Sequence, residues 1–225
     1  MLMRSYWLNF LPPRLSFISH DNRRSKMKLS NVAAVRSGLV LSRKEARGTF
    51  RIRYPLLNLR CIKPEGYIDM DQIDIFDAGD SLSPEYLSQV GDVVIRLTAP
   101  YTAVLIDEYT ANMVISSKFV VIRVKRHEIL PGYLFWLLNT QKVKRGIYEN
   151  ATSNMLGAVK AKYFSEFEID PLPIADQERI ISLNSLALRE KQLLLQLVEE
   201  KEKFYTMAID KIHKEMKRGN ENDDP

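Results

Sequence analysis

The 225-residue chain combines 45% hydrophobic and 9% aromatic residues with a formal net charge of +5. This composition supports a packed core and excludes a wholly disordered chain, and no apolar run approaches the roughly 20 residues of a membrane-spanning helix. The single cysteine, Cys61, excludes an internal disulfide framework and fits a reducing, cytoplasmic location.

The first 26 residues are basic and aromatic, but Pro12, Pro13 and Arg14 interrupt any continuous apolar stretch. This pattern argues against a secretory signal. We therefore expect residues 1–26 to form an ill-ordered extension, with Met27 as a plausible natural start.

Charge is distributed unevenly along the chain. Residues 1–60 hold 13 Lys/Arg and 2 Asp/Glu, whereas residues 61–112 hold 2 Lys/Arg and 10 Asp/Glu. A basic region beside an acidic one is typical of a confined polyanion-binding face, although basic residues that only solubilise the surface give the same counts. The acidic residues at 69–77 lack the glycine and terminal glutamate of a calcium loop, so a solvated face is favoured there over a metal site.

Short elements are predicted up to residue 124. Residues 28–35 have the apolar spacing of a short helix that ends in a turn at Gly38. Strand chemistry recurs further along, and the third and fourth of the predicted strands form a hairpin. The predicted strands are 49–54, 57–62, 90–97, 103–106 and 113–124.

Pro131 opens an amphipathic helix that is expected to end near Gly146. A polar loop is predicted at 150–157, and residues 160–169 favour a helical turn and a strand before Pro171. Strands in runs with few helices predict an α+β fold, with one mixed, β-rich domain over residues 27–172.

The last part of the chain is one helical pattern. No proline or glycine occurs from Ile174 until Gly219, and apolar residues recur at three- and four-residue steps. Glu190 and Lys201 interrupt a perfect heptad, so the prediction is a coiled-coil-like spacer helix at 173–218, followed by an acidic, disordered tail at 219–225. About 44 residues at 1.5 Å each give roughly 65 Å, more than a domain of this size can cover, so the surplus should pack on another chain. The residues assigned to this partner face are Leu183, Ala187, Leu194, Leu197, Phe204, Ala208 and Ile212.

Familiar catalytic loops are missing from the sequence. The nine glycines lie at least ten residues apart, which excludes the usual glycine-rich loops for phosphate, dinucleotide or adenosylmethionine. His20, His127 and His213 are widely separated, and one cysteine gives no familiar zinc spacing. We therefore expect no metal, no cofactor and no covalent chemistry in this chain.

Residues 170–181, DPLPIADQERII, resemble the sequence that closes each target-recognition domain in the specificity (S) subunits of type I restriction-modification systems. The matching positions are Pro171, Leu172, Pro173, Gln177, Arg179 and Ile180. Weaker similarities follow the family's order at 28–38, 91–94, 131–138 and 150–156. The resemblance therefore covers about residues 27–185.

The resemblance implies one target-recognition domain followed by a spacer helix. A full S subunit has two of each, so the chain resembles a half-subunit that pairs with itself or with another half-subunit. The resemblance further implies a non-catalytic chain that recognises double-stranded DNA. Its partner would be a methyltransferase (M) subunit that carries S-adenosylmethionine, joined in some complexes by a restriction (R) subunit. A homodimer would read a bipartite, inverted-repeat site.

Two sets of residues are expected to contact DNA. Arg43, Lys44, Arg47, Arg51 and Arg53 can neutralise phosphates. Base reading is assigned to a strand end and to the polar loop, namely to Arg96, Thr98, Tyr101, Ser153, Asn154 and Lys160. Arg96 could instead pair with the acidic segment, and Asn154 could cap the next helix.

Two other function classes stay open. One is a small magnesium-dependent restriction nuclease that uses the Asp-rich segment. The other is a helical scaffold or recombination cassette that does not read DNA by itself.

Overall fold

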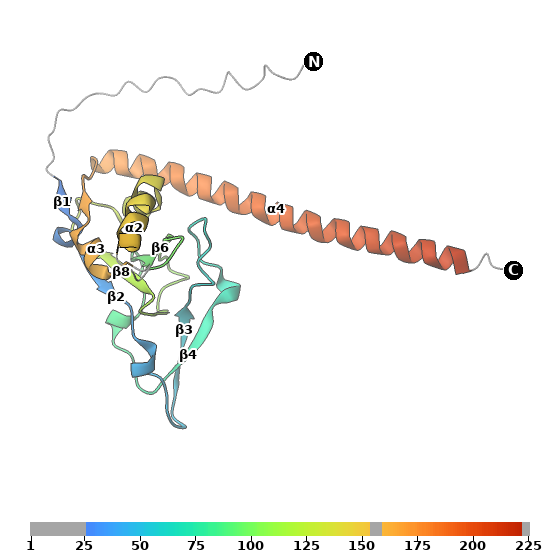
Figure 1. Cartoon of the computed structure of the whole chain (residues 1–225), viewed down its shortest axis with the longest axis horizontal. Helices are drawn as coiled ribbons and strands as arrows, with labels where there is room; N and C mark the ends of the chain where they lie inside the picture. Colours follow the sequence, from blue (N-terminus) through green and yellow to red (C-terminus); the bar gives the residue numbers. More distant parts are fainter. Residues whose placement is uncertain (1–25, 154–158, 222–225) are drawn as a thin grey trace, which may run out of the picture.

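The computed structural model describes residues 26–153 and 159–221. These residues adopt an α+β fold, in which small sheets and short helices form a body and one long helix projects from it (Figure 1). The predicted fold class, a β-rich α+β body followed by a long C-terminal helix, is confirmed. None of the helices in these ranges combines the length and hydrophobicity needed to cross a membrane.

The centre of the body is an antiparallel sheet with the strand order β2-β8-β5-β6. Its strands are β2 (Ala33–Ser37), β5 (Val93–Arg96), β6 (Ala103–Leu105) and β8 (Phe119–Val124). Side chains alternate between the two faces of the sheet, so Val93 and Ile95 enter one hydrophobic cluster and Val94 enters another. Because both faces are covered, β5 and β8 are apolar on both sides.

Helices cover one face of this sheet. They are α1 (Pro131–Asn139), α2 (Gln141–Ser153) and α3 (Ala161–Glu166). Their buried side chains, including Leu134, Leu138, Ile147 and Phe164, form the largest hydrophobic cluster with β5 and β8. Beside them, β1 (Met27–Lys28) pairs with β9 (Glu168–Ile169), which ties the two ends of the body together.

A second sheet, β4-β3-β7, covers the other face. Strand β3 (Ile52–Leu57) pairs antiparallel with β4 (Asp74–Ala78) and parallel with β7 (Val114–Ile115). Single turns of 3-10 helix lie between successive strands of the body, at η1 (Leu29–Asn31), η2 (Leu41–Arg43), η3 (Met70–Gln72) and η4 (Pro84–Tyr86). Below the second sheet, Leu39, Phe76 and Leu82 close a third cluster.

Two predicted elements in the first half are wrong. Residues 28–35 form η1 and the start of β2 instead of one helix, because Ala33–Ser37 pairs along its whole length with β8. Residues 57–62 form a turn after β3 instead of a second strand. The Asn58 side chain closes this turn, since its Oδ1 accepts hydrogen bonds from the backbone N–H groups of Arg60 and Cys61.

The predicted strand 113–124 and helix 131–146 are each interrupted. A turn at residues 116–118 separates β7 from β8. Helix α1 ends at Asn139, whose amide bonds both backbone groups of Ala103 on β6. Helix α2 then runs through Ser153, so the first part of the predicted polar loop is helical.

Helix α4 (Ile174–Glu221) starts directly after the Pro-Leu-Pro turn and extends past residue 218, the predicted end of the spacer helix. Its 48 residues correspond to a length of about 72 Å. The predicted extension at 1–26, except Lys26, and residues 222–225 of the predicted tail lie outside the described residues.

Candidate nucleic-acid interface

The five residues predicted to bind phosphate lie on one loop and the strand after it, from η2 into β3. We call residues 43–53 the basic loop. It lies at the end of the body away from α4, at the bottom of Figure 1. The backbone N–H of Ala46 donates to Asp77 O (3.0 Å), and Gly79 N–H donates to Lys44 O (2.9 Å). These bonds attach the N-terminal flank of the loop to the end of β4, and the pairing of Ile52 and Arg53 with β4 attaches the C-terminal flank.

The acidic segment partly neutralises the basic one. Arg51 and Arg53 both pair with Asp77, at 3.4 and 3.3 Å. Farther along, Lys63 pairs with Asp69 at 2.9 Å, and this hydrogen bond lowers the pKa of the Asp69 carboxyl. Within the described part of the chain, Arg43, Lys44 and Arg47 form no ion pair. The loop thus keeps positive charge for a polyanion.

Thr98 and Lys160 lie close together although they are far apart in the sequence. Val159 N–H donates to Leu97 O at 3.1 Å, and Leu97 N–H donates to Lys118 O at 3.1 Å. Thr98, Lys118 and Lys160 are all exposed. We call these three residues the strand-end surface.

The strand-end surface and the basic loop occupy the same end of the central sheet. Strand β2 ends and β8 begins there, and Arg96 at the end of β5 pairs with Phe119 at the start of β8. The turn that carries Lys118 contacts the segment leading to the basic loop, because Ser117 N–H donates to Leu39 O at 2.7 Å. Lys118 was not predicted as a site residue. Only its position in a short turn between two strands could have indicated it.

Two residues predicted to read bases have other contacts. Arg96 donates to Leu59 O (3.5 Å) and Ala99 O (3.3 Å), and burial lowers the pKa of its guanidinium. Its partners are carbonyl groups, so the alternative ion pair with the acidic segment is wrong. The side chain of Tyr101 is only 5% exposed, and burial raises the pKa of its phenol. Arg96 is thus partly buried and bonded to the loop at 97–102 through Ala99, and Tyr101 is buried beneath the same loop.

The other two predicted base readers, Ser153 and Asn154, belong to the polar loop. The backbone of Ser153 ends α2, but its side chain and the whole of Asn154 lie outside the described residues.

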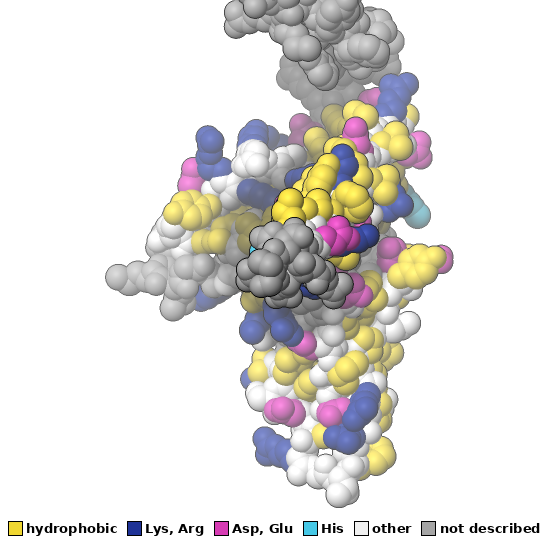
Figure 2. Space-filling view, turned by 90° about the vertical axis from the view of Figure 1, so that its right-hand side faces the viewer, with side chains coloured by type: hydrophobic (Ala, Val, Ile, Leu, Met, Phe, Trp, Pro, Cys, Tyr) yellow, Lys and Arg dark blue, Asp and Glu magenta, His cyan; other side chains and the backbone are white. Residues whose placement is uncertain are grey.

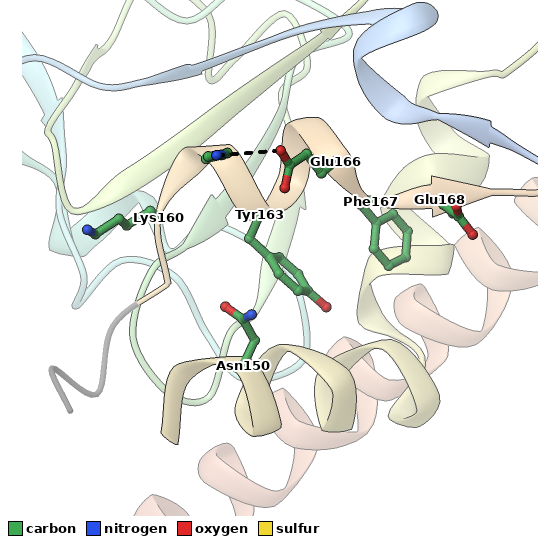
Figure 3. A pocket seen from close by; sticks show the side chains of 7 residues that line it. Asn150, Lys160, Tyr163, Glu166, Phe167 and Glu168 are labelled. Carbon is green, nitrogen blue, oxygen red and sulfur yellow. Dashed lines mark ion pairs between the residues drawn. The ribbon is translucent and has the colours of Figure 1, made fainter. Parts of the chain in front are cut away.

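A pocket of about 550 Å³ lies between α2 and α3, and Lys160 is at its rim (Figure 3). Tyr163 points from α3 towards Asn150 of α2, and Lys162 pairs with Glu166 at 3.7 Å. The pocket is lined by residues of both charges, an amide and two aromatic rings: Asn150, Lys160, Lys162, Tyr163, Glu166, Phe167 and Glu168. Such a lining has no excess charge that would select an anion or a cation.

Asp92, which lies between Gly91 and the start of β5, is buried, and both of its carboxylate oxygens are hydrogen-bonded. Both of its carboxylate oxygens accept hydrogen bonds from Arg123 at 2.7 Å, and Gln89 N–H donates to Oδ2 at 2.9 Å. Among residues 26–153 and 159–221, no three His, Cys, Asp or Glu side chains are grouped so that they could hold a metal ion. Arg123 is thus the structural partner of the Asp92 carboxylate.

Helix α4 is attached to the body through Gln177. This side chain is fully buried and makes three hydrogen bonds. Its Oε1 accepts from Leu130 N–H (2.8 Å), and its Nε2 donates to Glu128 O (2.9 Å) and Leu172 O (2.8 Å). One turn later, Ile181 packs on Gly132 of α1, where an added Cβ would lie 3.1 Å from Ile181 Cγ1. These contacts set the direction in which α4 leaves the body.

Beyond Lys191, which pairs with Glu65 at 3.5 Å, α4 extends away from the body. Figure 2 views the molecule from the C-terminal end of α4 and shows hydrophobic side chains exposed around it. Leu194 is 56% exposed and Phe204 is 61% exposed. Because leucine and phenylalanine stabilise a protein mainly when they are buried, this exposed stripe is a candidate surface for contact with another chain.

The arrangement defines a class of protein: an α+β body with a basic surface at one end, joined by a Pro-Leu-Pro turn to a long helix with an exposed apolar stripe. Comparison with solved structures finds a similar fold in S subunits of type I restriction-modification systems. The chain is similar to the HsdS subunit from Thermoanaerobacter tengcongensis, at 17% identity and a TM-score of 0.56, over 75% of this chain and 43% of that one.

The chain is also similar to a subunit in a structure that addresses complex assembly and conformational transition of the type I R-M system. That match has 15% identity and a TM-score of 0.51, over 78% of this chain and 42% of that one. The match to the type I S subunit from M. genitalium has 13% identity and a TM-score of 0.46, over 76% of this chain and 41% of that one. No protein-family model and no curated protein sequence matches the chain. The chain thus has an S-subunit fold, as the sequence resemblance predicted, and spans about two fifths of the length of these subunits.

Proposed function

We propose that the chain is a DNA-recognition half-subunit of a type I restriction-modification system and is not itself an enzyme. In this proposal residues 27–172 form the target-recognition domain, and residues 173–218 form the spacer helix. The observation that carries the proposal is the S-subunit fold with five basic residues on one anchored loop. Basic residues on an anchored backbone lose less conformational freedom when they bind phosphates than the same residues on a free loop.

The two ends of the interface have different roles in the proposal. The basic loop contacts phosphates and sets the register of the protein on DNA. The strand-end surface, together with Ser153 and Asn154, reads base edges. Lys118 and Lys160 can donate to guanine, and Thr98 can donate or accept. Arg96 and Tyr101 act indirectly, by holding the loop that carries Thr98.

Helix α4 supplies the partner contacts. Its exposed stripe would bind a second copy of the chain or another half-subunit. The M subunit, which would carry S-adenosylmethionine and act on adenine, would dock on the paired helices. In a complete system in the cytoplasm the R subunit would join this complex. The exposed leucine and phenylalanine side chains of α4 support this part of the proposal.

The basic loop provides the test. Replacing Arg43, Lys44 and Arg47 by alanine removes three charges that have no ion-pair partner among the described residues. If each contacts one phosphate, the slope of log affinity against log salt concentration falls by about 3. The measurement is an electrophoretic shift of duplex DNA from a random-sequence pool, with the purified chain and its M subunit.

A matched control replaces Lys211, Lys214 and Lys217 near the end of α4, which removes the same charge far from the loop. An equal loss in both variants would show that only net charge matters. A wild-type chain without sequence-selective binding at low salt would contradict the proposal.

The nuclease and scaffold alternatives lead to different results. A nuclease that used Asp92 would need this carboxylate free, whereas Arg123 occupies both of its oxygens. Magnesium-dependent DNA cleavage by the purified chain would nevertheless support a nuclease. A scaffold that does not read DNA would assemble its partners and function unchanged after the three substitutions in the basic loop.

A further inference from the structure

Phe50 lies at the tip of the basic loop and is 67% exposed. Arg47, Arg51 and Arg53 are close to it in the sequence, so the segment that carries this large apolar ring is rich in guanidinium groups. An exposed phenylalanine forgoes the stabilisation of about 2 kcal/mol that burial of its ring contributes. None of the roles described above for the basic loop uses this ring.

The tip is held in place by its two flanks. On one side of β4, Glu45 forms a bridge with Ala78, and on the other side Ile52 of β3 pairs with the same residue. Residues 47–51 therefore cross the end of β4 between two fixed points. At Gly48, an added Cβ would meet no atom within 4 Å, so the tip stands clear of the body. The ring is thus presented outwards at a defined place.

The surrounding charges indicate what the ring meets. The arginines that precede and follow Phe50 in the sequence attract the phosphates of a nucleic acid. Between two phosphate contacts, the apolar surface that duplex DNA offers is its base stack. Proteins that bend DNA insert apolar side chains between base steps in this way, and the larger interface with the bent duplex offsets the loss of stacking.

We propose that Phe50 is an apolar wedge that inserts at a base step of the bound duplex, while Arg47 and Arg51 hold the phosphates on either side. This inference rests on the proposed DNA-recognition function. It adds a positioning residue: the wedge fixes the body on the duplex and favours sequences with an easily unstacked step, such as a pyrimidine–purine step.

The experiment uses the full chain with duplexes recovered from a random-sequence pool by the wild-type protein. Single adenines are replaced in turn by 2-aminopurine, whose fluorescence rises when it is unstacked. Wild-type protein is expected to raise the fluorescence at one step. Phe50→Ala is expected to abolish this rise and to weaken binding about tenfold, because loss of one aromatic–base contact has an effect of this size. Phe50→Trp should retain both the fluorescence rise and the affinity of the wild type.

Tyr109→Ala is the matched control, because Tyr109 is 85% exposed on a different loop. It should bind and unstack DNA like the wild type. Equal effects of Phe50→Ala and Tyr109→Ala, or unchanged fluorescence and affinity in Phe50→Ala, would overturn the wedge and leave DNA recognition standing. Loss of M-subunit binding alone in Phe50→Ala would also overturn it, in favour of a protein contact. Failure of the wild type to select any duplex would refute the proposed function itself.

Discussion

At the scale of single residues, Asp77 controls how much of the charge on the basic loop is available. Its carboxylate pairs with both Arg51 and Arg53, so one acid holds two of the five basic side chains. Phosphates must compete with Asp77 for these guanidinium groups. Asp77→Asn should therefore raise the affinity for duplex DNA about two- to fivefold at low salt, the range expected for an exposed ion pair.

Asp80→Asn is the control for this prediction, because Asp80 is exposed on the same segment and, among the described residues, forms no ion pair. Fluorescence anisotropy with labelled duplex DNA measures both variants. Equal increases would show that the protein's net charge is responsible and not the release of Arg51 and Arg53.

Cys61 is a second residue whose surroundings determine its chemistry. Its thiol is buried, donates to Asn58 O at 2.9 Å and accepts from Asn58 N–H at 3.2 Å. Burial, the largest cause, raises the pKa of the thiol above its ordinary value of 9.0. The thiol should therefore stay protonated and react with iodoacetamide far more slowly in the folded protein than in denaturant. Equal labelling rates, measured by mass spectrometry, would contradict this.

The same shift gives a pH dependence. A thiol whose pKa is raised by folding binds its proton more tightly in the folded state, so it contributes stability below the unfolded value. This contribution is lost as the pH rises above about 9. Cys61→Ala should lower this alkaline sensitivity in urea denaturation measured across that range. Part of the alkaline sensitivity should persist in Cys61→Ala, because the pKa values of buried tyrosine phenols, such as that of Tyr133, are also raised.

At the scale of elements, the contact between α4 and the body depends on one buried amide. Gln177→Leu replaces the amide by an apolar side chain of similar size and leaves Leu130 N–H, Glu128 O and Leu172 O without their partner. Buried groups without a hydrogen-bond partner are expensive, so the free energy of unfolding should fall by about 2–4 kcal/mol. Glu178→Leu changes an exposed neighbour and should stay within about 0.5 kcal/mol of the wild type. Denaturant unfolding of both variants decides the matter.

The success of sequence reasoning differed among elements for physical reasons. Helix α4 could be predicted because it is long, periodic and free of glycine and proline between Ile174 and residue 218. Residues 28–35 could not, because pairing of β2 with β8 outweighs their helical spacing. The end of α1 at Asn139 could not be predicted either, since the Asn139 amide bonds to the backbone of Ala103, 36 residues earlier. Local patterns predict local structure, and these failures depend on long-range partners.

The candidate site shows the same division. The five basic residues lie within residues 43–53, so their proximity could be predicted from the sequence. The proximity of Thr98, Lys118 and Lys160 could not, because it results from hydrogen bonds of Leu97 with Val159 and Lys118. Burial of Tyr101 likewise depends on the helices that cover the sheet.

At the scale of the whole molecule, α4 has two faces with different partners. Successive residues of a helix are about 100° apart. Among the residues that pack on the body, Ile181 and Leu188 therefore lie on a different side of the helix from Leu183, Leu194 and Phe204. A second chain can bind the exposed stripe while the first body stays attached. The two contacts are compatible in geometry, which a paired recognition device requires.

Pairing through α4 gives the last prediction. Leu194→Glu places a charge within the stripe, and burying an unpaired carboxylate is costly enough to weaken a helix pair about hundredfold or more. Gln196→Glu adds the same charge about 200° around the helix, on the opposite side, and should leave the association intact. Analytical ultracentrifugation measures the association of both variants and of the wild type. A monomeric wild type would contradict pairing through α4.

A symmetric pair also determines the form of the DNA site. Two identical bodies related by a two-fold axis meet equivalent half-sites in opposite orientations, so the selected duplexes should contain an inverted repeat. Leu194→Glu should then reduce selection to single half-sites, because each body still carries its own basic loop. Two unrelated half-sites in the wild-type selection would instead show that a different half-subunit occupies the exposed stripe of α4.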